Sequence, residues 1–186
     1  MAVTWTEAEA LPASYPAVSG LSAAAAALNE DALWQRIESY CRVRWTPREV
    51  VWTIEGDGDW NVPLWPATLN TVEVWENFAW VECSPYPSPS PWGGYEFLGE
   101  GPYRVTADVG GGDVPAAVTE AFRRLAEYSA DLGENSMMSG HPAHKSHAVQ
   151  LGESVQESFA RDSTWAARAL QLSGAADLLR PYRRRA

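Results

Sequence analysis

The hydrophobic period of this chain changes twice, and these changes limit the folds it can adopt. Within residues 31–44, apolar side chains recur at three- and four-residue steps, as on one face of a helix. From Arg48 the period becomes two, which is typical of a half-buried strand: Val50, Trp52 and Ile54 alternate with Val51, Thr53 and Glu55. A helical period returns after Pro115 and continues to Leu132. The sequence therefore predicts an α+β fold: a small antiparallel sheet packed by two to three helices, with extended N- and C-terminal arms.

Glycine, proline and short polar runs divide the middle of the chain into further strands. Return strands are predicted at residues 60–64, 70–75, 78–83, 93–98 and 102–109. Turns are predicted at residues 56–59, at Glu76-Asn77 and at residues 99–101. Proline at every second position from Pro85 to Pro91 favours an extended loop. Shorter helices are predicted at residues 22–28 and from a cap at residues 162–164.

These elements predict four segments. Residues 1–21 form an N-terminal arm, and residues 22–132 form a core of helix, antiparallel strands and helix. Residues 133–161 are polar and are predicted as a loop or linker. Residues 162–186 are predicted to hold a C-terminal helix and a basic docking tail.

Charge and hydropathy exclude some classes of protein. The net charge is −10 and the pI is about 4.7, so sequence-independent binding to nucleic acid is disfavoured. The mean hydropathy is −0.28 and no apolar run is long enough to span a bilayer, so we do not expect this chain to be a membrane protein. Residues 1–7 lack the basic and apolar regions of a signal peptide, so secretion by that route is not expected. The basic tail, residues 180–185, fits an acidic partner, phosphate or plain solvation.

Few residues point to catalysis or cofactor binding. Cys41 and Cys83 form no CxxC pair, so we expect free thiols in a reducing cytosol. No phosphate-binding loop and no G-x-S-x-G nucleophile motif occurs. Asp57 and Asp59 are better explained as a hairpin turn than as calcium ligands, since the distal Glu of a calcium loop is missing. We therefore predict no enzyme, no cofactor and no metal.

The three histidines leave one alternative open. His141, His144 and His147 have the spacing H-x-x-H-x-x-H, and three imidazoles can bind zinc with a fourth position left for water. Pro142 disfavours the helix that would align them, and no fourth ligand lies within the segment. A polar loop that happens to contain histidines is the plainer interpretation, with a zinc-dependent hydrolase as the alternative.

Tryptophan is the most unusual component, with ten residues in the chain. Six of them fall in or beside the predicted sheet: Trp52, Trp60, Trp65, Trp75, Trp80 and Trp92. Three interpretations remain open. They can fill the core of a thin sheet, anchor a protein interface, or form a platform that binds carbohydrate.

The order of elements and several short motifs resemble the head-to-tail connector, or adaptor, proteins of long-tailed phages, most closely those of phage-like gene transfer agents. Residues 31–44 resemble the first long helix of that family, and residues 64–75 resemble its "L-x-P-x-x-x-x-x-V" segment that begins the sheet. Residues 103–110, then Val114-Pro115 and residues 121–128, resemble its strand, "V-P" turn and following helix. Residues 173–175 and 178–183 resemble its C-terminal segment. The likeness covers most of residues 31–185; residues 1–22 and 133–150 have no clear counterpart.

The resemblance implies a structural role in the neck of a virion or phage-like particle, assembled in the bacterial cytoplasm. Members of the family form a homo-oligomeric ring, usually twelve-fold, beneath the portal. The ring joins the portal protein to a stopper or tail protein, and DNA passes through its lumen without sequence-specific contact. A tail-proximal stopper protein and a carbohydrate-binding module are the alternatives.

Two sets of residues are predicted to carry this role. The C-terminal segment of the family tends to reach the portal, so portal docking is expected of Trp165, Leu178, Leu179, Arg180, Tyr182, Arg183, Arg184 and Arg185. The arginines would pair with portal carboxylates, or with DNA phosphate if they face the lumen. Contacts between subunits of the ring are expected of Trp52, Trp75, Trp80 and Trp92.

Overall fold

The computed structural model of this chain describes residues 2–91, 93–138, 146–151, 155–160 and 167–184, with side chains described for 2–91, 93–131 and 167–184. The fold is α+β, as the sequence predicts. The chain forms two compact units. The sheet unit comprises Met1–Tyr15, Arg42–Asp113 and Arg184–Ala186, and the helical unit comprises Pro16–Cys41 and Val114–Arg183.

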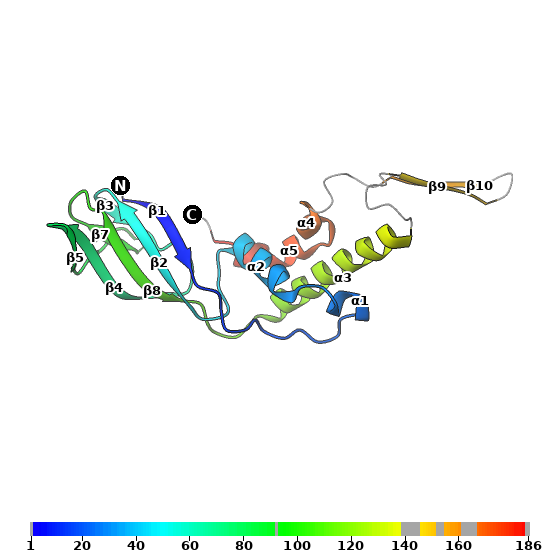
Figure 1. Ribbon diagram of the computed structural model, residues 1–186, viewed down its shortest axis with the longest axis horizontal. Coiled ribbons are helices and arrows are strands. Elements are labelled where there is room, and N and C mark those ends of the chain that lie inside the picture. Colours follow the sequence, from blue (N-terminus) through cyan, green and yellow to red (C-terminus); the bar gives the residue numbers. More distant parts are fainter. Residues whose placement is uncertain (1, 92, 139–145, 152–154, 161–166, 185–186) are drawn as a thin grey trace. The chain divides into compact units, whose positions relative to one another are not determined.

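Two antiparallel sheets make up the sheet unit (Figure 1). The larger has the strand order β1-β2-β8-β4-β5, and the smaller has the order β3-β7-β6. The strands of the larger sheet are β1 (Val3–Glu9), β2 (Arg48–Glu55), β4 (Ala67–Glu76), β5 (Ala79–Glu82) and β8 (Tyr103–Val109). Those of the smaller are β3 (Gly58–Trp60), β6 (Tyr86–Pro87) and β7 (Tyr95–Phe97).

The core of the sheet unit lies between these two sheets. The period-two pattern of β2 buries Val50, Trp52 and Ile54 on one face, as predicted. From the smaller sheet, the Trp60 ring packs edge-on against Trp52, with ring centroids 5.7 Å apart, and against Phe97, at 5.9 Å. The other face of the larger sheet is therefore not part of this core.

The first part of the predicted N-terminal arm is a strand of the larger sheet. Residues Val3–Glu9 form β1, which pairs antiparallel with β2. Two buried indoles bind it from the core side: Trp52 Nε1 donates to Glu7 at 2.9 Å, and Trp60 Nε1 donates to Thr4 Oγ1 at 2.9 Å. A buried indole N–H needs an acceptor, so these bonds fix the position of β1 along β2.

An ion cluster closes the end of β1. Glu9 accepts a bidentate pair from Arg44, at 2.6 and 2.7 Å, and a third bond from Arg48 at 2.8 Å. Arg48 also donates to the carbonyl of Thr46, at 3.1 Å. Burial raises the pKa of Glu9, but the hydrogen bonds and charges of the two arginines outweigh it and lower the pKa below its usual value.

The helical unit is built around α3 (Ala116–Met138), which packs against the shorter helices α1 (Ala23–Ala26), α2 (Glu30–Cys41), α4 (Ala169–Leu172) and α5 (Ala175–Leu179). A short 3₁₀ turn, Arg180–Tyr182, follows α5. The rings of Trp34 and Phe122 meet in its core at 4.9 Å. Asn29 caps α2 by accepting from Ala32 N–H at 3.1 Å, and α2 covers most of the helix predicted within residues 31–44.

Some predicted boundaries differ from the structure. The loop predicted for residues 133–161 is partly helical and partly strand, because α3 continues to Met138 and β9 (Ser146–Leu151) pairs with β10 (Val155–Ala160). Pairing between these strands depends on cross-strand contacts, which local polarity does not reveal. The predicted strand at residues 60–64 is β3 instead, and it ends at Trp60. In the described ranges no helix combines the length and the apolar character needed to cross a bilayer.

Candidate functional site

The β4–β5 hairpin ends in a two-residue turn made of Asn77 and Phe78. The register pairs Glu76 with Ala79, and the two turn residues have φ of 48° and 63°. Two-residue turns with positive φ favour Asn followed by Gly, because a bulky side chain is strained there. The turn predicted at Glu76-Asn77 was therefore one residue too early, since the pairing of Trp75 with Trp80 sets the register.

A network of side chains fixes the hairpin on the face of the larger sheet that points away from the core. Trp75 and Trp80 pack edge to face with ring centroids 5.2 Å apart. The Arg104 guanidinium of β8 lies 4.6 Å from the Trp80 ring centre and donates two bonds to Glu73, at 2.6 and 2.8 Å. The hydrogen bond from Arg104 lowers the pKa of Glu73. The hairpin thus has a defined shape before any partner binds.

The end of the hairpin, residues 75–80, exposes apolar side chains, and we call it the hairpin tip. Phe78 is 92% exposed and Trp75 is 41% exposed. Glu76 and Asn77 are also exposed between them. The Phe78 ring is almost fully exposed and so adds little to the packing of the chain, which makes the hairpin tip a candidate interaction surface.

The four predicted ring-interface tryptophans separate in the structure. Trp75 is exposed and Trp80 is half-buried, both in the hairpin. Trp52 is fully buried in the core of the sheet unit, so it cannot contact another subunit, and its assignment to the interface is corrected here. Its alternation with buried Val50 and Ile54 was the signal for a core position. Trp92 lies outside the described residues.

The predicted portal-docking segment also divides into buried and exposed parts. Leu179 is fully buried in the helical unit, so it is a core residue rather than a docking residue. Leu178 and Tyr182 are half-buried, whereas Arg180, Arg183 and Arg184 are exposed. Arg183 lies 5.2 Å from the Tyr40 ring centre, and Arg184 lies 3.9 Å from that of Trp65. Trp165 and Arg185 lie outside the described residues.

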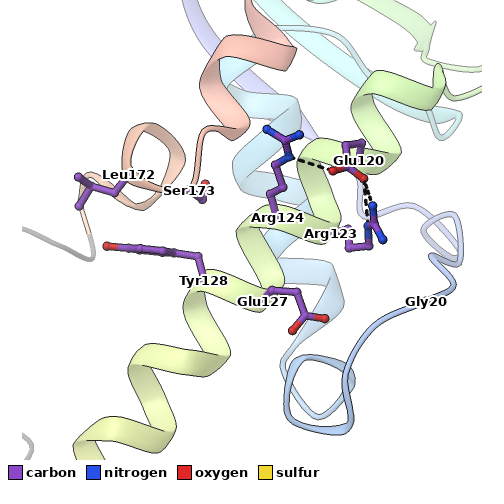
Figure 2. Close-up of a pocket in the computed structure, with 8 residues that line it drawn as sticks. All are labelled: Gly20, Glu120, Arg123, Arg124, Glu127, Tyr128, Leu172 and Ser173. Carbon is purple, nitrogen blue, oxygen red and sulfur yellow. Dashed lines mark hydrogen bonds and ion pairs between the residues drawn. The ribbon is translucent and has the colours of Figure 1, made fainter.

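The helical unit contains a pocket of about 540 Å³ beside α3. Figure 2 shows Tyr128 pointing from α3 toward the segment that carries Leu172. Leu172 is 46% exposed, so the pocket offers apolar surface to solvent. The lining residues are Gly20, Glu120, Arg123, Arg124, Glu127, Tyr128, Leu172 and Ser173.

Charged side chains form one wall of this pocket. Glu120 accepts from Arg123 and, at 2.9 Å, from Nε of Arg124, and these bonds lower the pKa of Glu120 (Figure 2). Glu127 accepts from the backbone N–H and the hydroxyl of Ser22, both at 2.7 Å, and the backbone bond is the larger cause of its lowered pKa. Arg123 and Arg124 thus share the carboxylate of Glu120, to which Arg124 donates through Nε.

The helical period after Pro115 predicts the helix that carries most of the pocket residues, but it gives no sign of the pocket itself. The spacing of Glu120 and Arg124, four residues apart, indicates an ion pair on one helix face. No local signal brings Gly20 and Leu172 to the same place, because they join α3 only through tertiary packing.

Metal and thiol chemistry find no support in the part of the chain that the structure describes. His141 and His144 lie outside the described residues, as does the side chain of His147. Among the described side chains no group of three metal-binding residues occurs. Burial, with the Glu38 charge, raises the pKa of Cys41 to about 12, and burial also raises the pKa of Cys83. Both free thiols are therefore poor nucleophiles near neutral pH.

Comparisons with known proteins do not identify a relative. No protein-family model, no curated protein and no solved structure matches this chain. The two candidate surfaces that the geometry supplies are therefore the hairpin tip on the sheet unit and the pocket on the helical unit.

Proposed function

We propose that this chain is a structural adaptor, one subunit of a ring that lies beneath the portal of a phage-like particle and joins it to a stopper or tail protein. The observation that carries the proposal is the hairpin tip, where Phe78 is 92% exposed in a strained turn. In a subunit of a ring, an exposed aromatic residue such as Phe78 would be buried when the subunits assemble.

The order of elements supports the proposal. The resemblance to connector proteins implies a helix, antiparallel strands, a V-P turn and a second long helix. In this chain α2, the larger sheet and α3 follow in that order. Pro115 lies immediately before α3, and its carbonyl accepts from Val118 at 2.9 Å and from Thr119 at 3.1 Å. Proline fits this place because an N–H group at the start of a helix has no acceptor within the helix, so proline loses no hydrogen bond there.

The charge distribution agrees with a ring through which DNA passes. The chain carries a net charge of −10, and like charge keeps DNA from adhering to the surface it slides past. The exposed arginines of the C-terminal segment, Arg180, Arg183 and Arg184, are available for an acidic partner. We assign that partner as the portal protein, whose carboxylates they would pair with.

The experiment that tests this proposal is a pull-down of the chain with purified portal rings of the same particle, followed by negative-stain imaging. A ring added at one pole of the portal is the expected result. Absence of binding to intact portal rings would contradict the proposal, and glycan titration followed by tryptophan fluorescence would then test the carbohydrate alternative.

A matched pair of variants tests the docking segment. Deleting residues 178–186 also removes buried Leu179, so a loss of binding would not separate docking from folding. The triple variant Arg180→Glu, Arg183→Glu, Arg184→Glu reverses exposed charges and should abolish capture by portal. Because it also removes the contacts of Arg183 with Tyr40 and of Arg184 with Trp65, an unchanged melting temperature must show that the variant still folds. The control Arg42→Glu reverses another exposed arginine and should leave capture unchanged.

A further inference from the structure

The hairpin tip exposes an apolar side chain, Phe78, at the end of the β4–β5 hairpin. Phe78 is 92% exposed, and its positive φ is a strained conformation that glycine would adopt freely. The adjacent Trp75–Trp80 pair, bound through Arg104, holds the turn in a fixed place. The tip therefore presents one preformed, exposed aromatic ring, and the exposed residue Glu76 directly precedes the turn.

The pocket on the helical unit has the size and the apolar lining that an aromatic side chain needs. Its volume of about 540 Å³ is ample for a phenyl ring, and Tyr128 and Leu172 offer apolar surface to it. Gly20 at its margin has no atom within 4 Å of where a Cβ would lie, so this side is open. An aromatic residue inserted beside Tyr128 would gain ring–ring contact as well as burial.

The tip carries one acidic side chain, and the pocket carries two arginines together with the carboxylates of Glu120 and Glu127. The acidic side chain of the tip, Glu76, forms no ion pair among the described residues. In the pocket, Arg123 and Arg124 share the carboxylate of Glu120. Toward the described side chains Arg124 donates through Nε, so its terminal nitrogens can bind a further carboxylate. A carboxylate that arrives with the phenyl ring would meet these donors.

From these observations we infer that the hairpin tip of one copy of this chain inserts Phe78 into the Tyr128–Leu172 pocket of a second copy, with Glu76 facing Arg124. The inference deepens the proposed function, on which it rests, by naming the contact between ring subunits. The two surfaces are different, so the contact is head-to-tail, and contacts of this kind close into a ring when the rotation permits.

Disulfide trapping tests which surfaces meet. One preparation carries Phe78→Cys and the other carries Leu172→Cys, both with Cys83→Ser, while Cys41 stays because it is buried. When the two are mixed under oxidising conditions that allow assembly, a cross-linked dimer should form that neither gives alone. The control replaces Phe78→Cys with Leu11→Cys, a residue that is 81% exposed and lies outside the hairpin, and should give no dimer.

Two further variants separate contact from folding. Phe78→Gly removes the aromatic ring and relieves the turn, so it should weaken self-association by about tenfold or more while leaving the monomer folded. Glu76→Arg and Arg124→Glu should each weaken self-association, and the double variant should restore part of it. Restoration would not follow if the two residues acted separately.

The outcomes distinguish this inference from the proposed function. A ring on portal without the mixed disulfide between the Phe78→Cys and Leu172→Cys chains would overturn the inference and leave the adaptor role in place. The mixed disulfide without portal binding would support the inference and contradict the adaptor role. A disulfide between two Phe78→Cys chains in place of the mixed one would show a two-fold contact and overturn the inference. Failure to self-associate under any condition would overturn both.

Discussion

Glu9 and Arg44 form a bidentate ion pair, at 2.6 and 2.7 Å, that joins the end of the N-terminal strand β1 to the segment that follows α2. The Arg44 side chain is only 7% exposed and that of Glu9 is 23% exposed, so both charges are largely removed from water. Arg48 makes a third contact with the same carboxylate, at 2.8 Å. Removing Glu9 would take away the carboxylate that these two buried arginines share.

Glu9→Gln should therefore destabilise the protein by about 3 kcal/mol, since breaking a buried ion pair from one side leaves charge uncompensated. Urea denaturation measures the change. Glu55→Gln, at the exposed end of β2, is the matched control and should change stability by less than about 0.5 kcal/mol. Equal stability of the two variants would show that β1 does not depend on the ion cluster.

The same carboxylate should make stability depend on acid. The pKa of Glu9 is lowered from 4.5, so the folded state binds fewer protons than the unfolded state in this range. The contribution of the Glu9 carboxylate to the free energy of unfolding is therefore complete above pH 4.5. It is lost as the pH falls through the lower pKa that Glu9 has in the folded state. Denaturation midpoints measured from pH 6 down to about pH 3 should fall more steeply in the parent than in Glu9→Gln. Parallel curves would contradict this assignment.

Phe78→Gly should stabilise the isolated monomer by about 1 kcal/mol, because Asn-Gly suits a two-residue turn with positive φ. Little is lost in exchange, since Phe78 is 92% exposed. Phe78→Ala keeps the unfavourable backbone conformation and should remain close to the parent. Thermal unfolding at concentrations too low for self-association compares the three, and a lower melting temperature for Phe78→Gly would show that Phe78 packs within the subunit.

Trp52 and Trp75 should respond differently to the same change. Trp52→Phe removes a buried indole and its bond to Glu7, and should cost about 2–3 kcal/mol. Trp75→Phe, on the exposed hairpin, should change the free energy of unfolding by less than about 0.5 kcal/mol. Urea denaturation of both variants checks the contrast, and a similar loss in both would mean that Trp75 also belongs to the core.

Local pattern was sufficient for many elements of this fold. The alternation at Val50, Trp52 and Ile54 predicted β2 and its buried face, because strand side chains alternate between two environments. The helical period within residues 31–44 predicted α2, because apolar side chains at three- and four-residue steps share one helix face. The resemblance to connector proteins, which no comparison tests, also came from the sequence.

Contacts between distant residues decided the rest. Whether a tryptophan fills the core or faces a partner depends on which strand lies opposite, so Trp52 and Trp75 could not be separated by composition. The arm residue Glu9 finds Arg44 and Arg48 only after β1 pairs with β2. The pocket forms where Gly20 and Leu172 meet α3, more than a hundred residues apart in sequence. The sequence determined the period and ends of its elements through local physics, whereas burial and binding surfaces arose from packing that brings distant segments together.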